Sequence, residues 1–172
     1  MGSVEQLAAS SAHPFNSTLE TGIRALVLLD AFHPRRCDLL ELTWLDHLVV
    51  HTGDLDGQDA PQSLHPDLPN RAGELLVRRQ LVEKSLRLMQ RVHLVEVFET
   101  EEGISFGASE DAPSYLDLLQ VPYSAALKER ARWMAKRFAG LKTDEMRSLV
   151  ESRIGRWVAD FRLEDTIQRL EP

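Results

Sequence analysis

The stretch HLVEVFETEEGISFGAS, residues 93–109, decides the fold, because its pattern differs from that of the segments around it. Every second residue from Ile104 to Ala108 is apolar, which is the period-two pattern of a half-buried strand. The run from Leu94 to Thr100 is rich in β-branched and aromatic residues, and Glu101-Glu102-Gly103 separates the two runs. The stretch therefore predicts a β-hairpin with a short turn that contains glycine.

Three segments before this hairpin have the periodicity of helices. The first begins at Ser17-Thr-Leu-Glu20, a capping box in which hydroxyl and carboxylate each satisfy a free backbone N–H, and it ends near His33-Pro34. The second begins at Asp38 and ends at Gly53, and a loop follows it. The third runs from about Glu74 to Val92 with a buried stripe formed by Leu75, Val82, Leu86 and Met89.

Three helices followed by a hairpin is the order of elements in a winged helix-turn-helix domain, in which the hairpin is the wing. Beyond Pro113 the periodicity is helical again, with a stripe of Leu127, Ala131, Met134 and Phe138 and a last helix capped by Thr143. We therefore predict a mostly α fold with a small β-hairpin: a flexible tail at residues 1–14, a winged helix-turn-helix domain at 15–112 and a C-terminal helical hairpin at 113–172. The alternative is a helical bundle with an incidental hairpin.

Composition places the chain among soluble proteins with a hydrophobic core. The chain has 172 residues, about the length of one domain, and 43% of them are hydrophobic, which is enough to form a core. No apolar run approaches the length of a membrane span, and the start lacks the features of a signal sequence. Cys37 is the only cysteine, which excludes a disulfide framework and a CxxC metal knuckle. These features predict a cytoplasmic protein without a membrane contact.

The net charge of -7 is unevenly distributed along the chain. Residues 71–91 carry 6 basic and 2 acidic groups, and residues 123–142 carry 6 basic groups and 1 acidic group. Between them, residues 94–117 carry 7 acidic groups and no basic group. Blocks of alternating sign predict surfaces that meet charged partners.

His47 and His51 lie four residues apart in the second predicted helix, a spacing at which two histidines can bind one metal ion. Position 48 is Leu, where an HExxH enzyme has Glu, and no third ligand is marked by its spacing. The sequence also has no GxSxG, Walker, GxGxxG or Cys–His motif. We predict no catalytic activity, no metal and no cofactor. A metal-dependent enzyme built on the two histidines is the alternative, and a partly buried pair bonded to backbone or carboxylate groups is the simpler account.

The third predicted helix holds the candidate interaction site. The residues that we predict to contact a partner or a nucleic acid are Arg78, Arg79, Gln80, Lys84, Arg87 and Arg91. The last four share one helix face. Such a face is typical of a helix that enters the major groove of DNA, of a docking surface for an acidic protein partner, and of a helix side that only faces solvent. The glutamates of the hairpin oppose DNA binding, because they would face a phosphate backbone. The sequence therefore favours protein–protein recognition, with a DNA-binding regulator as the alternative.

Three runs carry a family resemblance: FNSTLETGIRALVLLDAFHPRRCDLLELTWLDHLVVHTGD, SLHPDLPNRAGELLVRRQLVEKSLRLMQRVHLVE and YLDLLQVPYSAALKERARWMAKRF. They resemble the middle components of prokaryotic ABC-three-component defence systems, the Lamassu-like anti-phage systems. The resemblance extends from Phe15 to about Phe138 and includes the SLHP and GELLVRR segments. It rests on extended similarity and not on a catalytic signature, so it identifies no functional residues.

The resemblance implies a small subunit without catalysis of its own. Systems of this family combine an ABC ATPase of the SMC/Rad50 kind, an effector that is often a nuclease, and a middle subunit that joins them. The expected partners are therefore the ATPase and the effector, with a DNA contact inside the complex as a further option. Winged-helix subunits are common companions of SMC ATPases, so the resemblance agrees with the fold predicted from the residues.

Overall fold

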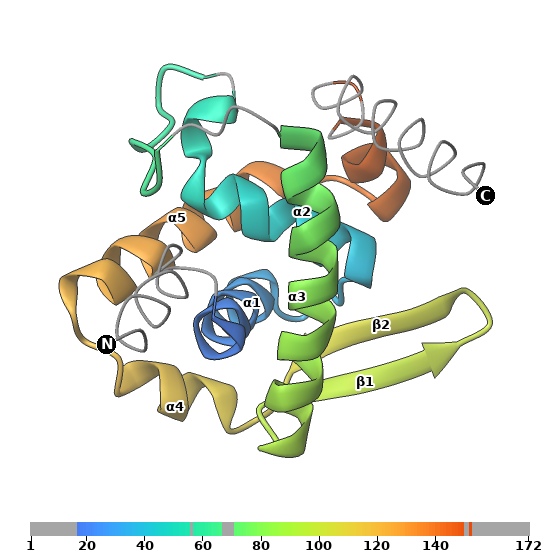
Figure 1. Cartoon of the computed structure of the whole chain (residues 1–172). Helices are drawn as coiled ribbons and strands as arrows, with labels where there is room; N and C mark the ends of the chain where they lie inside the picture. The colour runs from blue at the N-terminus through green and yellow to red at the C-terminus, as the bar shows by residue number, and fades with distance from the viewer. Residues whose placement is uncertain (1–16, 56, 67–70, 150–151, 153–172) are drawn as a thin grey trace, which may run out of the picture.

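The computed structural model of the protein describes residues 17–55, 57–66, 71–149 and 152. Helices predominate, and two strands form an antiparallel hairpin (Figure 1), so the predicted mostly α fold with a small β-hairpin is confirmed. The elements in chain order are α1 (Thr18–Phe32), α2 (Leu39–Val50), the 3-10 helix η2 (Thr52–Asp54), α3 (Arg71–Arg91), β1 (Val95–Thr100), β2 (Gly103–Ala108), α4 (Ala112–Asp117) and α5 (Pro122–Phe138). A further helical segment covers residues 143–149. The predicted tail at residues 1–14 and most of the last helix beyond residue 149 lie outside the described residues.

Capping residues fix where the first two helices begin. Ser17 Oγ accepts the backbone N–H of Glu20 at 3.1 Å, which is one half of the capping box that the sequence predicted. Asp38 and Glu41 form a complete capping box, with bonds of 2.8 and 2.9 Å between each carboxylate and the other residue's backbone N–H. The end of α2 differs from the prediction, because Gly53 lies in η2 and not at the helix cap.

α1 and α2 form the centre of the molecule. Most side chains of α1 and every α2 side chain from Glu41 to Val50 are buried. A helix that is buried all round needs neighbours on more than one side. α3 and α5 supply them by packing on different sides of α1 (Figure 1). No helix in the described part of the chain has the length and apolar character of a membrane span.

The predicted apolar stripes of α3 and α5 are buried as expected. Their members are Leu75, Val82, Leu86 and Met89 on α3 and Leu127, Ala131, Met134 and Phe138 on α5. Both stripes belong to one continuous core together with α1 and α2. A boundary near residue 112 therefore does not separate two hydrophobic cores, although the division of the chain into domains stays a prediction.

The hairpin forms where the sequence predicted it. β1 pairs with β2 in a register that places Thr100 opposite Gly103, so Glu101 and Glu102 form the turn. Gly103 has a φ angle of 123°, a conformation that residues with side chains rarely adopt. The base of the hairpin packs on α1 and α3, and its far end projects from the helical body (Figure 1).

The order of three helices and a hairpin matches a winged helix-turn-helix, but the connection between α2 and α3 is long. It spans residues 51–70, whereas a helix-turn-helix turn has about 3–4 residues. The described part of this connection is held on the core, because the N–H groups of Leu64 and His65 both donate to the carbonyl of Val50 at 3.0 Å. The winged helix stays an interpretation of this arrangement.

Candidate partner interface

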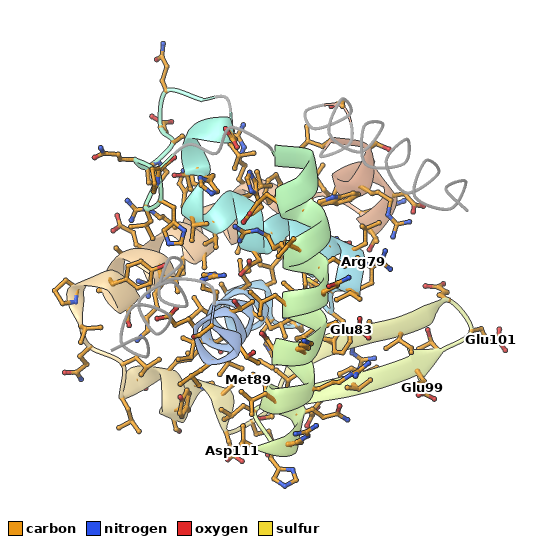
Figure 2. All side chains as sticks on the ribbon, viewed as in Figure 1. Arg79, Glu83, Met89, Glu99, Glu101 and Asp111 are labelled. Carbon is orange, nitrogen blue, oxygen red and sulfur yellow. The ribbon has the colours of Figure 1, made fainter. Side chains whose placement is uncertain are left out.

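α3 buries one side and exposes the other. The exposed polar and charged residues of its described surface are Arg79, Gln80, Glu83, Lys84, Arg87, Gln90 and Arg91. We call Gln80, Lys84, Arg87 and Arg91 the α3 face, because steps of three and four residues place their side chains in one row along the helix. Figure 2 shows α3 across the front of the molecule, with Arg79 and Glu83 along it. Five of the six predicted contact residues thus lie on the surface.

The α3 face carries more positive charge than its neighbours neutralise. Arg87 Nη2 lies 2.7 Å from Glu83 Oε1, but the two side chains are 65% and 48% exposed. An exposed pair one helical turn apart contributes only ~0.3–0.5 kcal/mol, so it leaves Arg87 available to a stronger partner. Lys84 and Arg91 form no ion pair within the part of the chain that the structure describes.

Arg78 does not belong to this surface, which corrects the prediction. It is 4% exposed, because it occupies the turn between Leu75 and Val82 on the buried side of α3. Asp46 of α2 supplies the opposite charge, with its Oδ2 atom 2.5 Å from Arg78 Nη1. Arg78 Nη2 also lies 2.8 Å from Glu74 Oε1. Arg78 therefore holds α3 on the core and is not available to a partner.

Asp46 is the centre of a buried ionic network that joins three helices. Its carboxylate is fully buried and accepts hydrogen bonds from Arg24 Nε at 2.8 Å and Arg24 Nη2 at 3.2 Å, in addition to the bond from Arg78. Burial alone would raise the pKa of Asp46, but the two guanidinium groups outweigh burial and hold this pKa below its usual value. Because α1, α2 and α3 each contribute a charge, the network fixes which side of α3 meets the core and which side meets solvent.

The histidines that suggested a metal site make other contacts. His47 Nε2 lies 2.9 Å from Asp54 Oδ2, and the ring centroids of His47 and His51 are 4.5 Å apart. His65 Nε2 lies 2.9 Å from the hydroxyl of Tyr123. Burial is the main cause that lowers the pKa of His51 and of His65 to about 4, so both rings are neutral near pH 7. Among the described residues, no group of three or more potential ligands is arranged to hold a metal ion.

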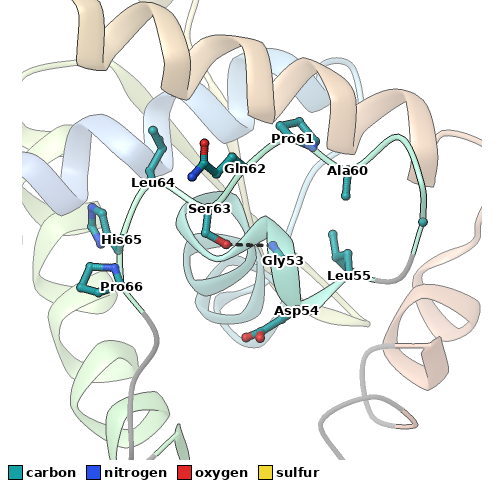
Figure 3. A pocket seen from close by; sticks show the side chains of 11 residues that line it. Gly53, Asp54, Leu55, Ala60, Pro61, Gln62, Ser63, Leu64, His65 and Pro66 are labelled. Atoms are coloured by element: carbon teal, nitrogen blue, oxygen red, sulfur yellow. Dashed lines mark hydrogen bonds between the residues drawn. The ribbon is translucent and has the colours of Figure 1, made fainter.

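The loop after α2 surrounds an open depression (Figure 3), lined by residues 53–55, 57 and 60–66. Inside the loop, the N–H of Gly53 donates to Ser63 Oγ at 2.9 Å. Arg130 of α5 donates twice to the carbonyl of Gln62, at 2.6 and 2.9 Å. These bonds fasten the connection between α2 and α3 to α5.

The hairpin carries the charge opposite to that of α3. Glu96, Glu99, Glu101 and Glu102 are all exposed, and we call them the acidic hairpin. Figure 2 shows Glu99 and Glu101 on the part of the hairpin that projects from the body. Arg36 covers one side of this element, since its guanidinium carbon lies 3.4 Å from the ring centroid of Phe98. Two surfaces of opposite sign thus lie on consecutive elements.

Comparison with protein families matches residues 14–160 to the ABC-three component (ABC-3C) system Middle Component 2. Comparisons with curated proteins and with solved structures give no match. The matched segment includes α1 to α5, the hairpin and the helical segment after residue 143, so it covers most of the chain. The resemblance to a middle component that the sequence indicated is confirmed. The chain belongs to the ABC-three component (ABC-3C) system Middle Component 2 family and is a subunit of such a system.

Proposed function

We propose that this subunit is a non-catalytic bridge in an anti-phage ABC-3C complex of the Lamassu-like kind. In this proposal it joins an ABC ATPase of the SMC/Rad50 kind to an effector, which is often a nuclease, and works in the cytoplasm. The observation that carries the proposal is the α3 face, an exposed row of one glutamine and three basic residues on a helix whose other side is packed into the core. The acidic hairpin provides a second surface of opposite sign for a second partner.

The way α3 is held supports a role in recognition. Its apolar stripe and the Asp46 network anchor the helix from within, so the α3 face is already in place before a partner arrives. A surface that is ordered in advance loses little conformational entropy on binding. Exposed charges at such a surface mainly set the rate and specificity of association, whereas charge pairs that lose their water contribute more to affinity.

The described residues support a role without catalysis. Cys37 is 1% exposed, and burial together with the charge of Glu41 raises the pKa of its thiol to about 12. The thiolate that a cysteine nucleophile needs is therefore disfavoured at neutral pH. The proposal assigns ATP hydrolysis and attack on nucleic acid to the other components of the complex.

A DNA contact by the α3 face is the second candidate. Arg, Lys and Gln side chains are the groups that bind phosphates and base edges. The acidic hairpin opposes this candidate, because it begins just after α3 and would bring four carboxylates toward a duplex that carries one charge per ~1.7 Å. An acidic protein surface meets the α3 face without this repulsion, so a protein partner is the first choice.

The test is charge reversal on the α3 face. Lys84→Glu, Arg87→Glu and Arg91→Glu are combined, and the subunit is co-expressed with the other components of its system and captured by a tag. We expect loss of co-purification and of defence against phage, with an unchanged melting temperature of the isolated subunit. The matched comparison reverses three exposed residues of the other basic block, Arg132, Lys136 and Lys142, with the same change in net charge, so it shows whether the effect belongs to the α3 face or to basic charge in general.

Two other outcomes would redirect the proposal. A triple variant that assembles normally but binds duplex DNA more weakly, with a reduced salt dependence, would support the DNA contact. A triple variant that assembles, binds DNA and defends like the parent would show that the α3 face is only solvated, and the proposal would be wrong.

A further inference from the structure

The hydrogen bonds of β2 determine which way the backbone of β1 faces. Cys37 and Phe106 exchange two backbone hydrogen bonds, at 3.0 and 2.8 Å, on the side of β2 away from β1. Phe106 therefore does not bond to Val97, its partner in β1, because the N–H and C=O groups of one residue point to the same side of a strand. Bonded and non-bonded pairs alternate along an antiparallel ladder, so Phe98 and Ser105 form a bonded pair.

The same alternation leaves the outer edge of β1 open. The N–H and C=O groups of Val97 and Glu99 point away from β2. No other backbone or side-chain group of the described chain bonds to them. Figure 2 shows Glu99 on the part of the hairpin that extends beyond α3. An open strand edge with regularly spaced donors and acceptors is a template for one more strand.

The side chains along the outer edge of β1 determine which charge an added strand must carry. Glu96, Glu99, Glu101 and Glu102 are exposed, and β1 and its turn contain no basic residue. A second copy of β1 would set these carboxylates against one another, and like charges on paired strands are destabilising. A basic strand would instead pair with them. Side chains alternate along a strand, so Val97 and Glu99 share one face of β1 and Glu96 points to the other. Val97 is half-buried, so it offers an apolar contact beside Glu99.

We propose that the outer edge of β1 binds an extended basic segment of a partner subunit by strand addition. Basic residues of that segment lie across from Glu96 and Glu99, and an apolar residue lies beside Val97. The inference rests on the proposed function, because the partner is a component of the same complex. It goes further by naming what the acidic hairpin recognises and how the backbone takes part.

The test uses proline to remove one outward N–H at a time. Val97→Pro removes a donor of the open edge and leaves the bonds between β1 and β2 in place, since edge positions of this kind tolerate proline. We expect the hairpin to remain and capture of the partner to weaken about tenfold, because the added strand loses a main-chain bond. Phe98→Pro is the variant for comparison, because it removes a donor that faces β2. We expect Phe98→Pro to disrupt the hairpin itself, whereas Val97→Pro should leave it intact.

Charge and hydrogen exchange supply two independent measurements on the full chain. Glu96→Lys combined with Glu99→Lys should abolish capture, while Glu110→Lys with Asp117→Lys, which are exposed but outside the strand, should not. In the parent protein, the amide hydrogens of Val97 and Glu99 should exchange rapidly in the isolated subunit and slowly in the assembled complex. Unchanged exchange at both amides would overturn the proposal, even if Val97→Pro failed to fold.

The outcomes separate this inference from the proposed function. If Val97→Pro and the Glu96/Glu99 double variant assemble like the parent while the α3 variant does not, strand addition is wrong and the bridging role stands. If the β1 variants fail to assemble while the α3 variant succeeds, strand addition stands and the α3 face is not the contact. If the isolated subunit forms dimers that Val97→Pro abolishes, the occupant is a second copy and the proposal of a basic partner strand is overturned.

Discussion

Replacing Asp46 by Asn tests whether the buried network holds α3 in place. The substitution preserves the shape of the side chain and removes its charge. Arg24 and Arg78, which are 2% and 4% exposed, then share a buried site without the carboxylate that both of them contact. Glu74 Oε1 remains 2.8 Å from Arg78 Nη2, so Arg78 keeps one partly exposed opposite charge.

The expected loss of stability is large. Removing one partner of a buried ion pair costs ~3–5 kcal/mol, because the remaining charge is left without compensation. Domains are stable by only ~5–15 kcal/mol, so this loss is a major part of the total. At about 2–4 °C per kcal/mol for a chain of this size, the melting temperature should fall by about 6–20 °C.

Thermal and urea unfolding of the purified subunit measure this effect. The matched control is Glu83→Gln, which breaks the exposed pair with Arg87 and should change stability by less than ~0.5 kcal/mol. Replacing Arg24, Asp46 and Arg78 together by apolar residues of similar volume should recover most of the loss, because no buried charge is then left over. If Asp46→Asn melts at the temperature of the parent, the carboxylate is not the counter-charge of the two arginines, and our account of how α3 is oriented is wrong.

Two further predictions concern acid stability and the hairpin. The pKa of His51 and of His65 is about 4 in the folded protein against 6.5 for the free side chain, so between these pH values the unfolded chain binds protons that the folded chain does not. The free energy of unfolding should therefore fall as the pH is lowered from 6.5 toward 4. Urea titrations at several pH values measure this dependence, and His51→Gln should flatten it. A free energy of unfolding that rises on acidification would contradict the prediction. Phe106→Asp should destabilise the protein by a few kcal/mol, because Phe106 packs against the core, whereas Ile104→Asp at a 53% exposed position should have little effect on the melting temperature. Equal effects of these two substitutions would contradict the packing of the hairpin.

Local signals in the sequence predicted the elements well. Ser17 and Asp38 mark helix starts because a capping bond joins residues only three apart, and the glutamate turn before Gly103 marks the hairpin for the same reason. The apolar stripe of α3 was also visible, since helical periodicity alone decides which residues share a face.

The contacts between distant residues were not visible in this way. Arg78 was expected on the surface because it stands in a basic run, but it bonds to Asp46, which lies 32 positions earlier. A signal was present, because Arg24 and Asp46 each interrupt an apolar run and so mark charges that need a buried partner. Nothing in one sequence states which of the many possible charges completes such a pair. The same holds for His65 and Tyr123, whose contact joins residues 58 positions apart.

Site-specific photo-crosslinking from position 80 tests most directly whether the α3 face binds a protein partner. Gln80 is exposed at one end of the α3 face, and a photo-reactive amino acid there changes no charge. In the complex assembled with the other components of the system, we predict a crosslink from position 80 to the ATPase or the effector. The same amino acid at Gln120, which is exposed and lies outside the charged blocks, should give none. Crosslinks from position 80 to DNA alone, or no crosslink from position 80 in an intact complex, would contradict the central claim.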